Sequence, residues 1–253
     1  MNSVIVRALL VRGMLAGLAA GLLAFGLAYL IGESGVNAGI AYEDAHTHEH
    51  SMELVSRAAQ STVGLATGVL VFGTAVGGIA ALAFCFSLGR IGQFGARGTA
   101  ALLAAGAFVT VYLVPFLKYP ANPPGSTDPD TIGKRTTLYF GMIALAVLIA
   151  LGAVILGRRL AGRFGNWNAT VAAAAAFIAV ITVTLAFLPA VNETPKDFPA
   201  TVLWQFRLAA LGIQALLWAS FGVVFGFLAE RVLRPRAVRS AQAAAAPGMP
   251  TAA

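Results

Sequence analysis

The sequence predicts an all-α fold, a polytopic membrane bundle of about six transmembrane helices with both termini in the cytoplasm. The mean hydropathy is +0.82, and only 11% of the 253 residues are charged, whereas soluble domains have about 25%. The apolar residues also form long blocks, each able to cross a bilayer core of about 30 Å at about 1.5 Å per residue. Finally, the loops between the blocks alternate between many and few basic residues, as expected for loops on the two sides of a membrane.

Six apolar blocks are separated by stretches that contain charge, proline or glycine. The predicted spans are about 9–31, 62–88, 98–117, 136–157, 169–189 and 208–229. They place residues 1–236 in a single transmembrane domain with a histidine-rich external loop at 32–61. The tail 237–253 has no pattern that would fold, and we expect it to be disordered.

The loop charges predict the orientation. The N-terminus, the second and fourth loops and the tail hold 11 basic residues and one acid, while the first, third and fifth loops hold five basic residues and nine acids. Because Lys and Arg are retained in cytoplasmic loops, we expect a multi-pass protein of the bacterial inner (cytoplasmic) membrane. The net charge of +7 then reflects topology, and we expect the lipid bilayer, not nucleic acid, as the partner of this chain.

Glycines spaced four residues apart predict close helix packing, because they lie on one helix face and let backbones approach in lipid. Such pairs occur in the first, second and sixth spans, which we expect to pack tightly against one another. They are Gly13, Gly17 and Gly21, then Gly64 with Gly68, Gly73 with Gly77, and Gly222 with Gly226. Chance matches are the alternative, since Gly makes up 28 residues of the chain.

All three histidines lie in the segment "DAHTHEHS" of the first external loop. Imidazole is the commonest side-chain ligand of first-row transition metals, and in an extended segment every second side chain projects from one face. We therefore predict a metal-capturing loop whose ligands are His46, His48, His50, Glu49 and Asp44. A solvated or pH-responsive loop is the alternative.

The third loop and the start of the sixth span supply a second group of polar residues. Asn122, Asp128 and Asp130 offer oxygen ligands near the outer surface, and Arg207 and Gln214 lie seven residues apart on one side of the last helix. A charge inside a span is costly unless it is paired or reaches the surface. These five residues are a candidate ion path in which we expect Arg207 to pair with a carboxylate; a rigid proline-rich turn and an Arg that reaches the surface are the alternative.

Several catalytic classes lack their residues in this chain. The sequence contains no P-loop, no Gly-x-Ser-x-Gly, no His-Glu-x-x-His and no Cys-x-x-Cys motif. We therefore expect a protein that is not an enzyme and that holds no resident cofactor.

Two stretches resemble the CbtA family of cobalt transporter subunits. They are "VPFLKYPANPPGSTDPDTIGKRTTLYF" at 114–140 and "ATVLWQFRLAALGIQALLW" at 200–218, and they follow "RGMLAGLAAGLLAF" and a histidine-bearing polar loop in the family's order. The resemblance covers nearly the whole chain before the tail.

This resemblance implies a membrane component of divalent transition-metal uptake. The expected cargo is Co(II), with Ni(II) and Zn(II) as alternatives, and the expected partner is a small single-span, histidine-containing protein (CbtB-like). A homo-oligomer is a further option. The alternative function is a non-transporting, metal-binding accessory subunit that assembles with a separate channel or with the small partner.

Overall fold

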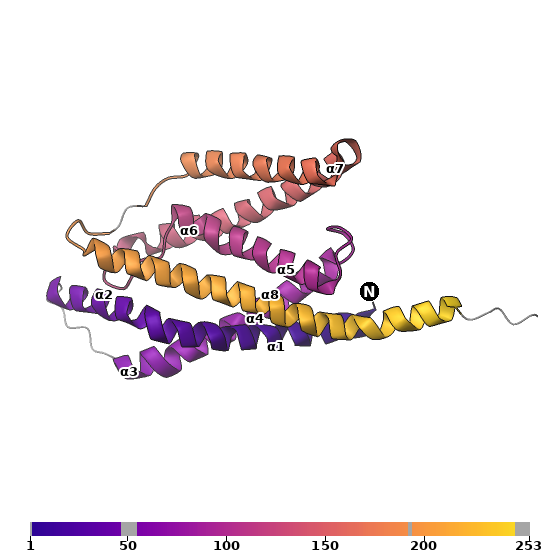
Figure 1. The fold of residues 1–253 in the computed structure, drawn as a ribbon. Helices are drawn as coiled ribbons and strands as arrows, with labels where there is room; N and C mark the ends of the chain where they lie inside the picture. The colour runs from indigo at the N-terminus through magenta and orange to yellow at the C-terminus, as the bar shows by residue number, and fades with distance from the viewer. Residues whose placement is uncertain (1, 47–54, 192–193, 246–253) are drawn as a thin grey trace, which may run out of the picture.

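The structure is a computed structural model that describes residues 2–46, 55–191 and 194–245. Within these ranges every regular element is a helix, and five helices are long and apolar enough to cross a membrane. The predicted class, an all-α membrane protein with several crossings, is confirmed (Figure 1). The main helices are α1 (Ser3–Leu27), α2 (Glu33–His46), α3 (Arg57–Ala59), α4 (Leu65–Ser87), α5 (Ala96–Ala107), α6 (Val114–Lys118), α7 (Ile132–Phe187) and α8 (Ala200–Ala245).

Three short π-helical segments join these helices into longer rods. Ala28–Gly32 connects α1 to α2, Gln60–Gly64 connects α3 to α4, and Phe108–Leu113 connects α5 to α6. A π-turn holds one residue more than an α-turn and is common at functional positions. All three segments occur toward the end of the bundle that we predict to face outward.

Helices occupy most of the described part of the segment 32–61 that we predict to be an external loop. The chain is helical from Ser3 to His46, so the first half of the expected loop 32–61 is α2. Its second half becomes helical again at Arg57, where the Ser56 hydroxyl accepts a hydrogen bond from the Ala59 amide at 3.4 Å. The helix continues beyond the apolar block because its polar residues can still form i to i+4 backbone hydrogen bonds, although they have no reason to lie in lipid.

The α1–α4 contact confirms the packing predicted for the first two spans. A Cβ atom added at Gly17 would lie 3.0 Å from the Gly77 Cα and would collide with the Gly73 carbonyl oxygen. Gly13 and Gly77 face each other in the same way. Glycine at these positions lets the two backbones touch, which is how helices associate where lipid removes the hydrophobic driving force.

The glycines of α8 also pack closely, but against a different helix from the one expected. A Cβ at Gly222 would lie 2.9 Å from the Ala104 Cβ, and one at Gly226 would lie 3.2 Å from the Arg97 Cα, both in α5. The prediction for Gly64 and Gly68 is wrong, because Gly64 approaches only its own backbone at Ala59 and no neighbour lies within 4 Å of a Cβ at Gly68.

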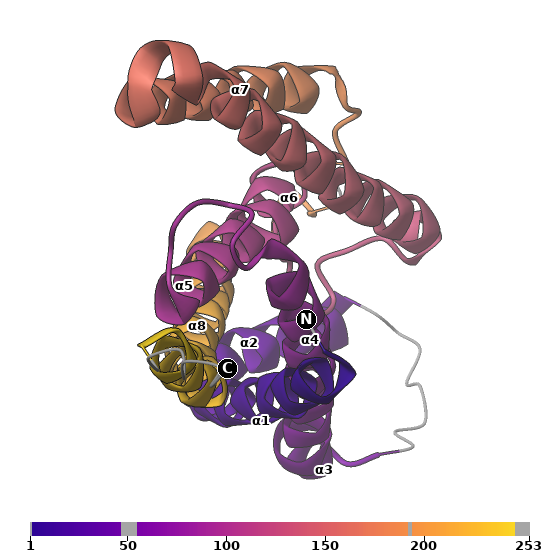
Figure 2. The same ribbon diagram turned by 90° about the vertical axis from the view of Figure 1, so that its right-hand side faces the viewer.

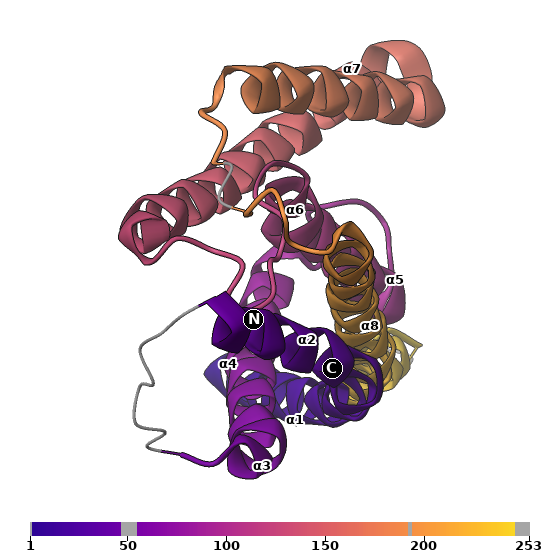
Figure 3. The same ribbon diagram turned by 90° about the vertical axis from the view of Figure 1, so that its left-hand side faces the viewer.

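Helix α7 contains both the fourth and the fifth apolar block. It breaks at Gly165, whose backbone has φ 75° and ψ 162°, and Figure 1 shows the chain doubling back there. The two arms meet where a Cβ at Gly157 would lie 3.1 Å from the Ala173 Cβ. Figures 2 and 3 show this hairpin set apart from α1, α4, α5 and α8, with α6 between them. The count of six crossings stays a prediction.

Helix α8 extends to Ala245, so helical structure enters the tail that we expected to be disordered from 237; residues 246–253 lie outside the described part. The N-terminus and the C-terminal end of α8 lie at the same end of the molecule (Figure 1). The assignment of that end to the cytoplasm, and the division into a domain and a tail, stay predictions.

Candidate metal site and ion path

His46 is the last residue of α2 and contacts the loop that precedes α8. Its Nδ1 lies 2.8 Å from the Tyr42 carbonyl oxygen, and its Nε2 lies 3.2 Å from Oδ2 of Asp197. The imidazole also stacks on the Tyr42 ring, with centroids 4.1 Å apart, and that ring meets Phe198 edge-on at 4.9 Å. The aromatic contacts therefore bring His46 to a carboxylate that is distant in the sequence.

The Asp197 carboxylate is kept in its charged form. A hydrogen bond from the Tyr42 hydroxyl and, to a smaller extent, the nearby His46 hold the pKa of Asp197 below its usual value. The His46 and Asp197 side chains are 52% and 63% exposed, so both can be reached from solvent. A charged carboxylate beside an exposed imidazole is a suitable pair of ligands for a divalent cation.

The rest of the predicted ligand set is only partly visible. Asp44 is exposed on α2, and because residues two apart on a helix do not face each other, it does not share a face with His46 as an extended loop would require. His48, Glu49 and His50 lie outside the described residues. Within the described part, no three His, Cys, Asp or Glu side chains converge in a way that could hold an ion.

Arg207 contacts Asn122, another residue of the predicted path. Its Nη2 donates to the Asn122 Oδ1 at 2.8 Å, and its Nε donates to the Ala121 carbonyl at 3.3 Å. The expectation of a carboxylate partner is not met by these contacts; an amide and a carbonyl oxygen take that role. Asp128 instead accepts a hydrogen bond from the backbone amide of Asp130 at 2.9 Å, and both acids are exposed.

The loop that carries Asn122 is held on both sides. On one side, Lys118 Nζ donates to the Leu185 carbonyl at 2.7 Å and the Tyr119 hydroxyl donates to the Pro189 carbonyl at 3.0 Å. On the other side, the loop touches α2 so closely that a Cβ at Gly39 would lie 2.5 Å from the Pro124 carbonyl oxygen. The loop, α2 and the start of α8 therefore form one cap at the end of the bundle that we predict to face outward.

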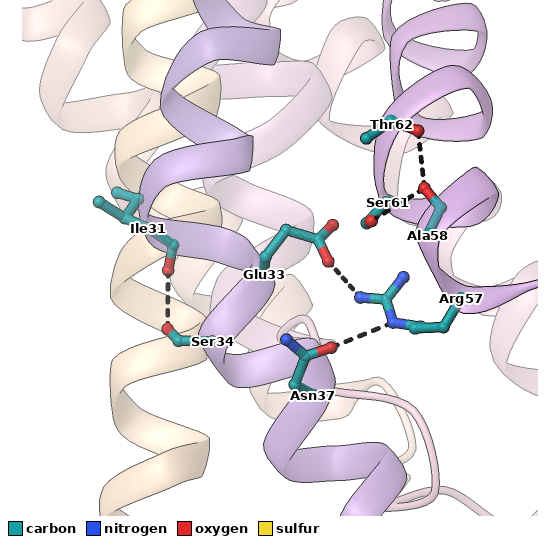
Figure 4. Close-up of polar contacts among 8 residues, drawn as sticks. All are labelled: Ile31, Glu33, Ser34, Asn37, Arg57, Ala58, Ser61 and Thr62. Atoms are coloured by element: carbon teal, nitrogen blue, oxygen red, sulfur yellow. Dashed lines mark hydrogen bonds and ion pairs between the residues drawn. The ribbon is translucent and has the colours of Figure 1, made fainter.

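Gln214 lies in a different part of the molecule from the Asn122–Arg207 contact. It lines an open cleft of about 580 Å³ between α1, α4 and α8 together with Glu33, Arg57 and Gln60. The arginine binds the Glu33 carboxylate through Nη2 and donates from Nε to the Asn37 Oδ1 at 3.1 Å (Figure 4). The predicted ion path is thus split between the Asn122–Arg207 cap and this cleft.

Sequence reasoning did not select Glu33, Arg57 or Gln60. A usable signal was present, because Glu33 follows the first apolar block by two residues and Arg57 precedes the second by five. Opposite charges flanking the outer ends of two adjacent spans can meet when those spans form a hairpin. The Asp197 contact had no comparable signal.

The comparisons with known proteins identify the family. No curated protein matches the chain, and no solved structure matches it. The family described as "Probable cobalt transporter subunit (CbtA)" matches residues 6–230, which confirms the resemblance noted in the sequence. The word "subunit" indicates that members work within an assembly. The chain belongs to the CbtA family of probable cobalt transporter subunits.

Proposed function

We propose that this chain takes up Co(II) across the bacterial inner membrane and that the segment from Asp44 to His50 captures the ion outside. The family match supports a membrane component of cobalt uptake. The capture role is supported by the position of His46 at the exposed end of α2, where the helix enters the histidine-rich segment.

The observation that carries this proposal is the His46–Asp197 pair. Two donor atoms bound at about 2.1 Å to one first-row ion, at right angles to each other, lie about 3 Å apart. The observed separation of 3.2 Å between Nε2 and Oδ2 needs little adjustment to reach that geometry. The Tyr42 carbonyl oxygen can accept a proton from Nδ1, so Nε2 is the ring nitrogen that faces Asp197 and would bind the metal. His48, Glu49 and His50 complete the proposed ligand set, and Asp44, on another face of α2, adds negative charge nearby.

The residues of the outer cap guide the ion inward in this proposal. Asp128 and Asp130 add negative charge at the outer surface. Asn122 accepts a hydrogen bond from Arg207, and this contact lets the loop approach α8. Gln214 lies further along, in the cleft between the spans. A small single-span, histidine-containing protein is the proposed partner.

A test is the uptake of radioactive Co(II) by cells that express this chain with and without the small partner. Replacing His46, His48 and His50 by Ala is expected to raise the half-saturating Co(II) concentration at least about tenfold without lowering the maximum rate. Asp197→Asn should produce a smaller increase, and Lys196→Gln, an exposed neighbour, should produce none. Unchanged half-saturation in the triple variant would exclude capture by this segment.

The alternative function is a non-transporting accessory subunit that binds metal and presents it to a separate channel. It predicts Co(II) binding by the purified chain but no uptake by cells that contain this chain without any partner. Uptake by the chain alone would exclude that role.

A further inference from the structure

The Glu33–Arg57 ion pair lines the cleft between α1, α4 and α8, and neither Asp44 nor His46 is among the described residues that line it. Both side chains are largely covered, with 17% of Glu33 and 28% of Arg57 exposed. Glu33 and Arg57 flank the outer ends of the first two predicted spans, and covering ionisable side chains is costly unless they are paired. We expect this pair of ionisable residues to do more than hold two helices together, because glycine contacts already hold α1 against α4.

The backbone is loosened on both sides of this pair. One π-segment, Ala28–Gly32, ends immediately before Glu33, and another, Gln60–Gly64, begins three residues after Arg57. Hydroxyl groups satisfy carbonyls around these turns: Ser34 donates to Ile31 at 3.3 Å, and Ser61 and Thr62 both donate to Ala58, at 3.2 Å and 2.6 Å (Figure 4). Hydroxyls that bond backward in this way often bend helices, so the walls beside the ion pair depart from regular α-helix.

Oxygen donors line the cleft next to the ion pair. The amide nitrogen of Gln60 donates to the Val55 carbonyl at 2.8 Å, which leaves the amide oxygen available, and Gln214 contributes a second amide from α8. Gly64 and Gly68 line the same cleft, and a Cβ at Gly68 would meet no atom within 4 Å, so the wall at that level is open. One carboxylate with amide oxygens is a hard donor set of the kind that binds divalent cations.

We infer that this cleft is a divalent-cation site in which Glu33 is the charged ligand, Gln60 and Gln214 supply oxygens, and Arg57 occupies the carboxylate until an ion displaces it. The exchange replaces one cationic partner of Glu33 by another, so the carboxylate is never left unpaired in a covered position. Asn37, which already accepts a hydrogen bond from Arg57 Nε, retains the displaced guanidinium. This inference rests on the proposed uptake function and adds a second site on the ion's route.

The test measures Co(II) binding by equilibrium dialysis with the full chain in lipid nanodiscs, in a background where His46, His48 and His50 are Ala. Glu33→Gln is expected to remove the remaining Co(II) binding. Arg57→Gln is expected to tighten that binding about tenfold, because the competing cation is gone. A purely structural ion pair would make both substitutions act in the same direction, so opposite signs support the site and equal signs overturn it.

A charge exchange keeps the outcome readable if a single variant folds poorly. Glu33→Arg combined with Arg57→Glu preserves an ion pair, so it should restore the amount of protein in the membrane but not the rate of Co(II) uptake. Full recovery of uptake would reduce the pair to a structural role and overturn the inference. If the unmodified chain binds no Co(II), the proposed function itself fails; if it binds only through the histidines, this inference alone fails.

Discussion

The four-helix part of the molecule and the α7 hairpin are both strongly apolar, yet they are built differently. In α1, α4, α5 and α8, small residues face one another, and backbones approach closely at Gly17 and Gly226. In α7, large side chains point outward, and Phe187 is 84% exposed. In an apolar 18-residue stretch of each helix, 33% of the residues are buried in the first span but only 11% in α7.

The difference shows that hydropathy alone does not decide which spans associate. Lipid is as apolar as Leu or Val, so large apolar side chains have little to gain from leaving it, whereas small residues gain van der Waals contact when backbones approach. The hairpin is instead fixed at its contact with α6 and the neighbouring π-segment, where Val114, Tyr119, Met142, Ala146 and Ile181 form a small separate cluster. We therefore expect the bundle to be sensitive to added volume and the hairpin to be tolerant of it.

The largest effect is expected from Gly17→Leu in the bundle. The added side chain would meet backbone atoms of α4, which cannot rotate away, so the free energy of unfolding should fall by at least about 3 kcal/mol. Gly152→Leu is the matched change in α7, where no neighbour lies within 4 Å of a Cβ, and it should alter stability by less than about 0.5 kcal/mol. Denaturation in mixed detergent micelles measures both; equal losses would remove the contrast between the two regions.

A smaller effect is expected at the turn of the hairpin. Gly165 has φ 75° and ψ 162°, a region that is essentially restricted to glycine, so Gly165→Ala should cost about 1–3 kcal/mol even though its surroundings are open. Gly162→Ala, three residues earlier in ordinary helical backbone, should be neutral or slightly stabilising. The same denaturation experiment compares them, and a neutral Gly165→Ala would mean that α7 does not reverse there.

The smallest effect concerns the outer contact at Asp197. Its pKa is lower in the folded protein than in the unfolded chain, so its contribution to stability is present above the unfolded pKa of about 3.9 and is lost as the pH falls through the folded value. The melting temperature of the unmodified chain should exceed that of Asp197→Asn by a constant amount between about pH 5 and 6. That excess should disappear in stronger acid, and one that persisted at pH 2 would contradict the assignment.

Much of the fold was predictable because each requirement of a membrane leaves its own signal in the sequence. Apolar length indicated the spans, and four-residue spacing indicated the α1–α4 contact at Gly13 and Gly17. The length of α2 was not predictable from the same signal, since residues 33–46 are polar enough for a loop and equally able to form a helix. Hydropathy could not separate those outcomes.

Of the contacts at the candidate site, the sequence indicated one and missed the others, and the metal chemistry itself stays a prediction. Histidine spacing indicated metal chemistry, and Asn122 and Arg207, named together as one path, lie in contact. The partner of His46 depends on how Tyr42 stacks against Phe198, a contact between segments distant in the chain that no local period encodes. Gln214 was grouped with Arg207 by helical spacing, but the turn of the helix carries it to the Glu33 cleft instead.

The continuous helical stretch from Ser3 to His46 determines how the membrane potential acts on a bound ion. Its 44 residues extend about 66 Å at about 1.5 Å per residue, more than twice the hydrocarbon thickness of about 30 Å. With the predicted span of about 9–31 in the hydrocarbon, a cation bound at His46 would stand beyond the voltage drop, while one at Glu33, thirteen residues lower, would stand near its edge. Loading at the tip should be indifferent to membrane potential, and the inward transfer of a divalent ion should gain about 4.6 kcal/mol per 100 mV.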